Sequence, residues 1–113
     1  FSSSGGATAA TAMANVMFET LLAKKNLQAA INKPRLHYET DTDEVVIEDR
    51  EKKDRLVSLI SLGHKVRRLP SIGRVNAISC PEALPSPNPQ CDVQADPRGS
   101  GVTSTVKFRK QER

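Results

Sequence analysis

The apolar residues in the first part of the chain predict a helix of several turns. Residues 7–23 are rich in Ala, Met, Val, Phe and Leu and contain neither Gly nor Pro, a composition that favours helix. Apolar side chains fall on nearly every face, which is typical of a helix buried between layers. The interspersed polar residues argue against a membrane span, which needs about 20 mostly apolar residues. One side carries only small residues, so we expect another backbone to approach it closely; they are Ala7, Ala10, Thr11 and Ala14.

Shorter elements follow this helix. Asn26 is a good N-cap for a second helix over residues 27–32, and Pro34 ends it. Two strand-like runs, 36–39 and 44–48, are joined by an acidic turn and predict a hairpin.

A third helix is predicted over residues 50–62, and Gly63 is placed to end it. Two further strand-like runs, 64–69 and 74–80, flank a turn that contains Pro and Gly. This order of elements predicts a mixed, layered α+β fold. The apolar face of the third helix is expected to consist of Leu56, Leu59 and Ile60.

Two cysteines, Cys80 and Cys91, bracket a segment too rich in proline for a helix or a central strand. The segment is therefore predicted to be a protruding loop. A disulfide across its base and a pair of free thiols both remain open. The spacing does not fit zinc, because no CxxC is present and the only histidines, His37 and His64, lie far away in sequence.

Composition and charge indicate a piece of a larger fold. The apolar fraction is 37%, below the usual range for a self-sufficient domain. The net charge is +4, but most of the excess lies in residues 107–113, which we expect to be a disordered basic tail after an incomplete domain over residues 1–106. Nucleic acid is not an expected partner, because aromatic side chains for base stacking are scarce.

The glycine pair before the first helix has the clearest chemical potential. Ser2, Ser3 and Ser4 lead into Gly5 and Gly6. Two glycines allow positive φ and the close approach of a ligand. Their N–H groups, beside a helix N-terminus, can converge on an anion or a developing oxyanion. The alternative is an ordinary glycine turn that starts a helix.

Four segments follow one another over residues 1–101: Ser4-Gly5-Gly6, residues 27–37, residues 72–78 and Asp96-Pro97-Arg98-Gly99, with Leu62-Gly63-His64-Lys65-Val66 as a further segment. In this order they resemble the small subunit of gamma-glutamyltransferases (glutathione hydrolases). That family has a Gly-Gly pair that begins a helix, an "aI-x-x-PR-hydrophobic-H" segment, a G-x-V-Q-A-I strand and a final "DPR-x-G" segment.

The resemblance implies the C-terminal segment of an N-terminal-nucleophile hydrolase with an αββα sandwich. In such enzymes autoproteolysis makes two subunits and exposes a catalytic threonine, which we expect upstream of Phe1. We assign no catalytic nucleophile here, since Thr8, Thr11 and Thr20 lie inside the first predicted helix and cannot offer a free α-amino group.

By position, Gly5 and Gly6 match the family's oxyanion-hole glycines. The family's carboxylate-binding serine pair precedes this segment, so that role is not carried onto Ser2, Ser3 or Ser4. The residues at positions 7–10 and the insertion between the cysteines depart from the common pattern.

The resemblance also implies a reaction and its partners. The expected reaction is cleavage of gamma-glutamyl amides such as glutathione, with transfer of the glutamyl group to water, amino acids or peptides and without a metal or organic cofactor. The implied partners are the large subunit and the rest of the small one. The implied location is the cell surface, with the anchor outside this segment, and there the two cysteines would be oxidised. An inactive or truncated homologue that acts as a scaffold or binding module is the alternative.

The other polar candidates are expected to have structural roles. His37 and His64 are placed at strand starts among apolar neighbours. Arg35 and Arg98 are expected to pack and to stabilise turns, with carboxylate binding as the alternative. Calcium is not expected at the remaining acidic group, because it lacks the glycine of an EF-hand loop; its members are Asp41, Asp43 and Glu44.

Overall fold

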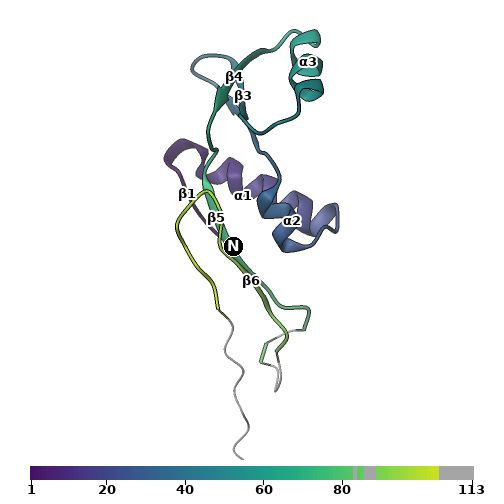
Figure 1. Cartoon of the computed structure of the whole chain (residues 1–113), viewed down its shortest axis with the longest axis vertical. Helices are drawn as coiled ribbons and strands as arrows, with labels where there is room; N and C mark the ends of the chain where they lie inside the picture. The colour runs from purple at the N-terminus through teal and green to yellow at the C-terminus, as the bar shows by residue number, and fades with distance from the viewer. Residues whose placement is uncertain (83, 86–88, 105–113) are drawn as a thin grey trace, which may run out of the picture.

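The computed structural model describes residues 1–82, 84–85 and 89–104. The predicted tail at 107–113 lies outside these residues. The structure contains two three-stranded sheets with the helices between and beside them (Figure 1). In chain order the elements are β1 (Ser2–Ser4), η1 (Gly6–Thr8), α1 (Ala9–Met17), η2 (Phe18–Leu22), α2 (Leu27–Asn32), β2 (Leu36–Glu39), β3 (Glu44–Glu48), α3 (Lys53–Ser61), β4 (Lys65–Leu69), β5 (Arg74–Ser79) and β6 (Asp92–Gln94).

The first sheet has the order β1-β5-β6, with both pairs antiparallel. Helices α1 and α2 pack on one of its faces, where alternate residues of β5, Val75 and Ala77, point inward. The core between them is small and entirely aliphatic; it consists of Ala12, Val16, Leu27, Ala30, Ile31, Val75 and Ala77. The opposite face of β5 is exposed, with Ile78 at 60%.

The second sheet has the order β2-β3-β4. The predicted hairpin is confirmed, since β2 and β3 pair antiparallel from Leu36 with Ile47 to Glu39 with Glu44. Strand β4 pairs parallel with β3, and α3 forms the crossover between them. Every residue of β3 after Glu44 is buried, including the carboxylate of Glu48.

The predicted first helix is present, but its geometry changes along its length. It begins with the 3₁₀ turn η1, continues as α1 and ends as the π-helical segment η2. Only one side is buried within this chain, and Phe18, Leu21 and Leu22 of η2 are exposed. On the small-residue side, only Thr11 meets another element, with its hydroxyl 2.9 Å from His37 Nδ1 of β2. The expected close approach along that side is otherwise wrong, because Ala7, Ala10 and Ala14 are exposed. The neighbouring backbone, at Gly73, instead meets the side of Ala12.

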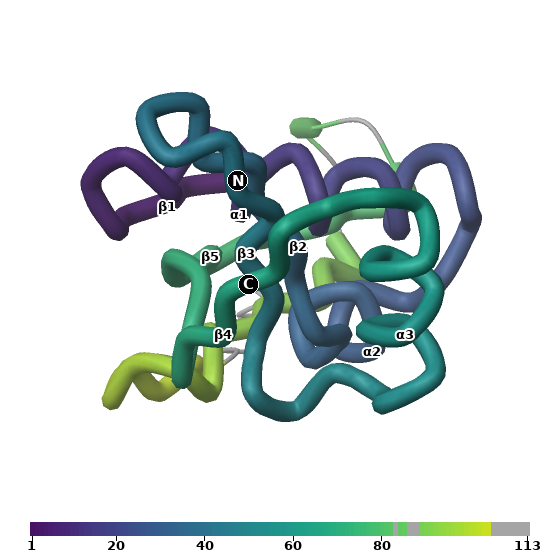
Figure 2. The backbone as a smooth tube through the Cα atoms, turned by 90° about the horizontal axis from the view of Figure 1, so that it is seen from above, coloured from purple at the N-terminus to yellow at the C-terminus, as the bar shows by residue number. Residues whose placement is uncertain are grey.

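Helix α3 is shorter than predicted, and it lacks the predicted buried face. It covers nine residues, none of them buried, and Ile60 is 56% exposed. Its end is as predicted: Gly63 has φ +91° and donates its N–H to Ile60 O, while the His64 N–H donates to Leu59 O. These two bonds form a Schellman cap. Figures 1 and 2 both place α2 and α3 on one side of the molecule and β1 on the other.

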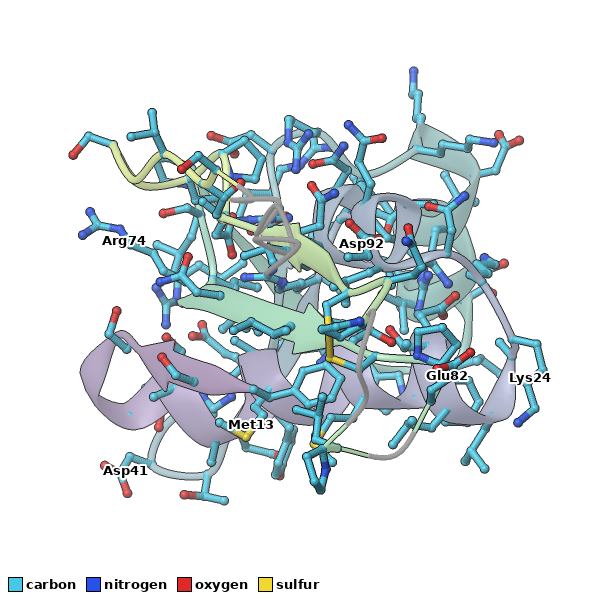
Figure 3. All side chains as sticks on the ribbon, turned by 90° about the horizontal axis from the view of Figure 1, so that it is seen from below. Met13, Lys24, Asp41, Arg74, Glu82 and Asp92 are labelled. Atoms are coloured by element: carbon cyan, nitrogen blue, oxygen red, sulfur yellow. A yellow bond between two sulfur atoms is a disulfide. The ribbon has the colours of Figure 1, made fainter. Side chains whose placement is uncertain are left out.

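Strands β5 and β6 form an antiparallel pair whose ends are joined by a disulfide. Cys80 and Cys91 have Cα atoms 4.2 Å apart and are bonded through their sulfurs, the yellow bond of Figure 3. Strands β1 and β6 were not predicted, because three-residue strands are too short to show an alternating pattern. None of the helices in the described ranges is long and apolar enough to cross a membrane.

Candidate functional site

The glycine pair forms the turn between β1 and the first helix. Gly5 has φ +132° and Gly6 has φ +58°, values that L side chains rarely adopt. The turn is closed by Thr8, whose N–H and hydroxyl donate to Gly5 O at 3.2 and 2.9 Å. Both glycines are therefore needed for the chain to leave the strand and enter the helix.

The N–H groups at this helix start are free of intrahelical acceptors, as in any helix. Gly6 is the first residue of η1, and both glycines are exposed. The turn borders an open, mostly polar pocket lined by Ser4, Gly5, Thr8, Ser71, Gly73 and Arg74. An anion or a polarised carbonyl oxygen in this pocket would lie beside the N-terminus of the helix, which carries the positive end of the helix dipole.

The two glycines differ in what a side chain would meet. A Cβ at Gly5 would lie 2.8 Å from Gly73 Cα and 3.0 Å from Thr8 Oγ1. A Cβ at Gly6 would meet no described atom within 4 Å. Gly5 is therefore confined by the fold itself, whereas the space beside Gly6 is open to a ligand.

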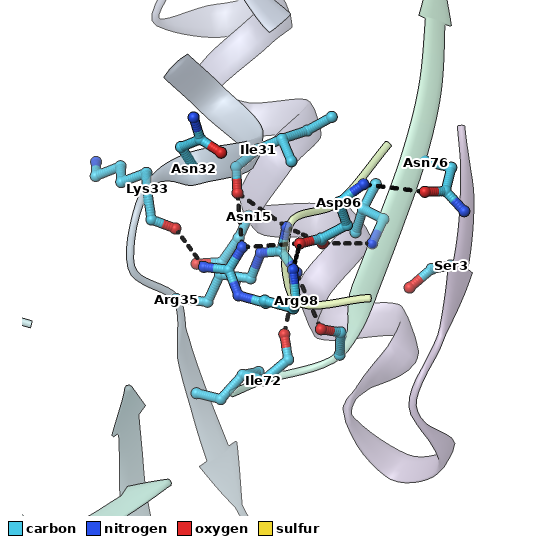
Figure 4. A network of polar contacts seen from close by, with 12 residues as sticks. Ser3, Asn15, Ile31, Asn32, Lys33, Arg35, Ile72, Asn76, Asp96 and Arg98 are labelled. Carbon is cyan, nitrogen blue, oxygen red and sulfur yellow. Dashed lines mark hydrogen bonds and ion pairs between the residues drawn. The ribbon is translucent and has the colours of Figure 1, made fainter. Parts of the chain in front are cut away.

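Behind this turn lies a cluster of four buried charged side chains, which we call the ion cluster: Arg35, Glu48, Asp96 and Arg98. Arg35 Nη2 donates to Asp96 Oδ2 at 2.7 Å. Arg98 contacts both carboxylates, with Nε and Nη2 at 2.5 and 2.6 Å from Glu48 and Nη1 at 3.1 Å from Asp96 Oδ1. Figure 4 shows the two guanidinium groups beside Asp96 at the end of α2.

The ion cluster also binds backbone groups. Arg98 donates to Ile31 O at 2.8 Å and to Lys33 O at 3.0 Å, and Arg35 donates to Ile31 O at 3.1 Å. Carbonyls at a helix C-terminus have no intrahelical donor. Both arginines therefore have the packing and turn-stabilising roles expected from the sequence.

Two opposing effects set the pKa values of the buried carboxyls. Burial alone raises the pKa of Glu48, but hydrogen bonds from Arg98 and from the Ile72 N–H outweigh burial and hold the pKa below its ordinary value. Burial likewise raises the pKa of Asp96, and hydrogen bonds from the N–H groups of Arg98 and Val75 bring it below its ordinary value. Both carboxyls are therefore ionised at neutral pH.

The remaining candidates are scattered. His37 is buried in β2, with Nδ1 2.9 Å from Thr11 Oγ1. His64 is exposed in the turn after α3, so its expected apolar surroundings are wrong. Within the described ranges no group of His, Cys, Asp or Glu side chains could hold a metal ion. The threonines at 8, 11 and 20 lie in η1, α1 and η2, as expected.

The sequence did not predict that Glu48 and Asp96 belong to a cluster. Arg98 lies 50 residues from Glu48, and Arg35 lies 61 residues from Asp96. Only the Asp96–Arg98 pair is local, so no local pattern connects the two carboxylates. One signal was available: Glu48 closes the apolar run Val45-Val46-Ile47, where a charge directly after buried positions requires a partner.

Comparison with known proteins gives a family match over nearly the whole chain. The model of the gamma-glutamyltranspeptidase family matches residues 1–106. No curated protein matches the chain.

Several solved structures match the fold. An acivicin-inhibited gamma-glutamyltranspeptidase, described as having a C-terminus critical for autoprocessing and catalysis, is 26% identical with a TM-score of 0.77 and is matched over 88% of this chain and 52% of its own. A Helicobacter pylori gamma-glutamyltranspeptidase mutant is 26% identical with a TM-score of 0.76, and the match covers 86% of this chain and 52% of its own. The Pseudomonas nitroreducens gamma-glutamyltranspeptidase complexed with L-DON is 20% identical with a TM-score of 0.78, and the match covers 93% of this chain and 53% of its own.

This chain thus spans about half the length of these solved chains. Its mixed helices and sheets have the fold of N-terminal-nucleophile hydrolases, which confirms the expected α+β class.

Proposed function

The protein belongs to the gamma-glutamyltranspeptidase family, and we propose that this segment supplies the oxyanion hole of such an enzyme through the N–H groups of Gly5 and Gly6. One observation carries the proposal: two consecutive glycines with positive φ begin a helix beside an open pocket. They lie inside the segment that the family model matches.

The proposed reaction is acyl transfer from a gamma-glutamyl amide such as glutathione. A threonine outside these 113 residues attacks the γ-carbonyl carbon, and the carbonyl oxygen becomes an oxyanion that accepts hydrogen bonds from the two N–H groups. Collapse of the intermediate expels the amine, which takes up the proton that the threonine hydroxyl lost on attack, and leaves an acyl ester on the threonine. Water, an amino acid or a peptide then attacks the ester and releases the threonine.

The proposed partners are the large subunit and the rest of the small subunit from the same precursor. The proposed location is the cell surface. The Cys80–Cys91 disulfide supports this location, because disulfides persist in oxidising compartments.

Gly6→Ala in the complete protein tests the oxyanion role. Gly6 has φ +58°, and a Cβ there meets no described atom, so the variant adds about 1 kcal/mol of backbone strain and a methyl group on the ligand side. We expect kcat with a gamma-glutamyl anilide to fall about 10- to 100-fold, since a lost oxyanion donor costs about 100- to 1,000-fold.

Gly63→Ala is the matched control. Gly63 also has positive φ, +91°, with no described atom within 4 Å of a Cβ, but it lies at the end of α3. We expect its kcat to stay within about twofold of the wild-type value. Equal kcat values for the processed Gly6→Ala variant and the wild type would refute the proposal, and a processed wild-type protein without turnover would favour the inactive homologue.

A further inference from the structure

A second turn is packed against the glycine pair, backbone to backbone. Gly73, between β4 and β5, has φ +60°. A Cβ at Gly73 would lie 2.6 Å from Ala12 Cβ and 3.3 Å from Ser4 O and from Thr8 O. From the other side, a Cβ at Gly5 would lie 2.8 Å from Gly73 Cα. Gly73 therefore touches the strand before the glycine pair and the helix after it.

The turn that carries Gly73 is fixed by two buried charges. The Ile72 N–H donates to Glu48 Oε1 at 2.7 Å, and Arg35 Nη1 donates to Ile72 O at 3.1 Å and to Gly73 O at 3.3 Å. Arg35 is 1% exposed and Glu48 is 0% exposed. Three backbone groups of two consecutive residues thus bind Arg35 and Glu48. These two side chains are held in turn by their ion pairs with Asp96 and Arg98.

We propose that Gly73 is a positioning residue for the oxyanion hole, an inference that rests on the proposed function of Gly5 and Gly6. The ion cluster holds the Ile72–Gly73 turn, and this turn holds the glycine pair through direct backbone contact. Donors of this kind act only when they lie about 2.7–3.1 Å from the developing charge. A displacement of about 1 Å can lower a rate about 100-fold.

Gly73→Ala in the complete protein tests the inference. The new Cβ must displace Ala12 or the glycine turn, so we expect kcat per active site, titrated with an irreversible glutamine analogue, to fall about tenfold or more with KM changed less than threefold. Adding Ala12→Gly to the Gly73→Ala variant removes the 2.6 Å contact between the new Cβ and Ala12 Cβ. This second substitution is expected to restore part of the lost kcat. A merely structural role would lower the amount of titratable enzyme but not kcat per site.

Gly63→Ala again controls for positive φ without a close contact. If Gly73→Ala yields no titratable enzyme, the double variant Gly73→Ala/Ala12→Gly tests the inference instead. In that variant the Cβ added at position 73 still lies 3.3 Å from Ser4 O and from Thr8 O. If the kcat per site of the double variant is about threefold or more below that of Ala12→Gly alone, the positioning role is supported. Equal kcat values for these two variants overturn it. If Gly6→Ala lowers kcat while Gly73→Ala does not, only the positioning inference fails. If Gly6→Ala has no effect, the proposed function itself fails.

Discussion

At the scale of single residues, the ion cluster shows how four charges can be buried together. Glu48 accepts hydrogen bonds from the Arg98 side chain, the Arg35 N–H and the Ile72 N–H. Removing one member of such a cluster leaves a buried charge without its partner, which costs much more than the intact pair contributes.

Arg98→Met is expected to destabilise the complete protein by about 3–5 kcal/mol, because Glu48 and Asp96 each lose a charged donor inside the protein. Urea unfolding measures the loss. The matched control is Arg67→Met, which breaks the exposed Arg67–Glu44 pair at 2.9 Å and is expected to cost under about 1 kcal/mol. Similar losses for the two variants would contradict the argument.

The sequence predicted the roles of the ion-cluster residues only in part. Packing and turn-stabilising roles were predicted for Arg35 and Arg98, with carboxylate binding as the alternative. The carboxylates that they bind were not predicted, because a pairing over tens of residues is decided by tertiary packing. The place of Gly73 against Gly5 was missed for the same reason.

At the scale of elements, reasoning from local sequence predicted the long helix from its composition, the hairpin from two strand-like runs around an acidic turn, and the end of α3 from Gly63. It failed where an element depends on its neighbours. Strands β1 and β6 have three residues each and exist through their pairing with β5. Helix α3 has an apolar pattern but no buried residue. Amphipathicity predicts which face of a helix can be buried, but not which element covers that face.

The hairpin of β5 and β6 is the element that depends most on covalent chemistry. Replacing Cys80 and Cys91 by Ser is expected to destabilise the protein by about 2–3 kcal/mol, since the disulfide closes a loop with a sequence separation of 11. Thermal unfolding with and without a reducing agent measures the effect. The reducing agent should lower the midpoint of the wild type and leave that of the double variant unchanged. A wild-type midpoint insensitive to complete reduction would exclude this contribution.

At the scale of the whole molecule, the ion cluster joins the two sheets. Glu48 ends β3 of the second sheet, whereas Asp96 follows β6 and binds the N–H of Val75 in β5 of the first. A change of charge in this cluster therefore affects the contact between both halves of the structure and the helix end that lies between them.

Acidification is expected to destabilise the protein through this cluster. The pKa values of Glu48 and Asp96 are lower in the folded protein than their ordinary values, so the unfolded chain binds protons first. The stabilisation is complete above the unfolded pKa values, about 4, and is lost as pH falls through the lower folded values. The unfolding midpoint between pH 6 and pH 2.5 measures this loss. Glu48→Gln should be less stable at pH 6 but lose less on acidification, and an equal slope for both proteins would contradict the assignment.

The long sequence separations within the ion cluster also determine when the cluster can form during synthesis. A ribosome releases Arg35 and Glu48 first, but Arg98 follows Glu48 by 50 residues and Asp96 follows Arg35 by 61. At about 5–20 residues per second, this interval lasts several seconds. Until the Asp96–Arg98 segment has emerged, neither early charge has its ion-pair partner, so the Gly5–Gly6 turn acquires its support only after residue 98 has been synthesised.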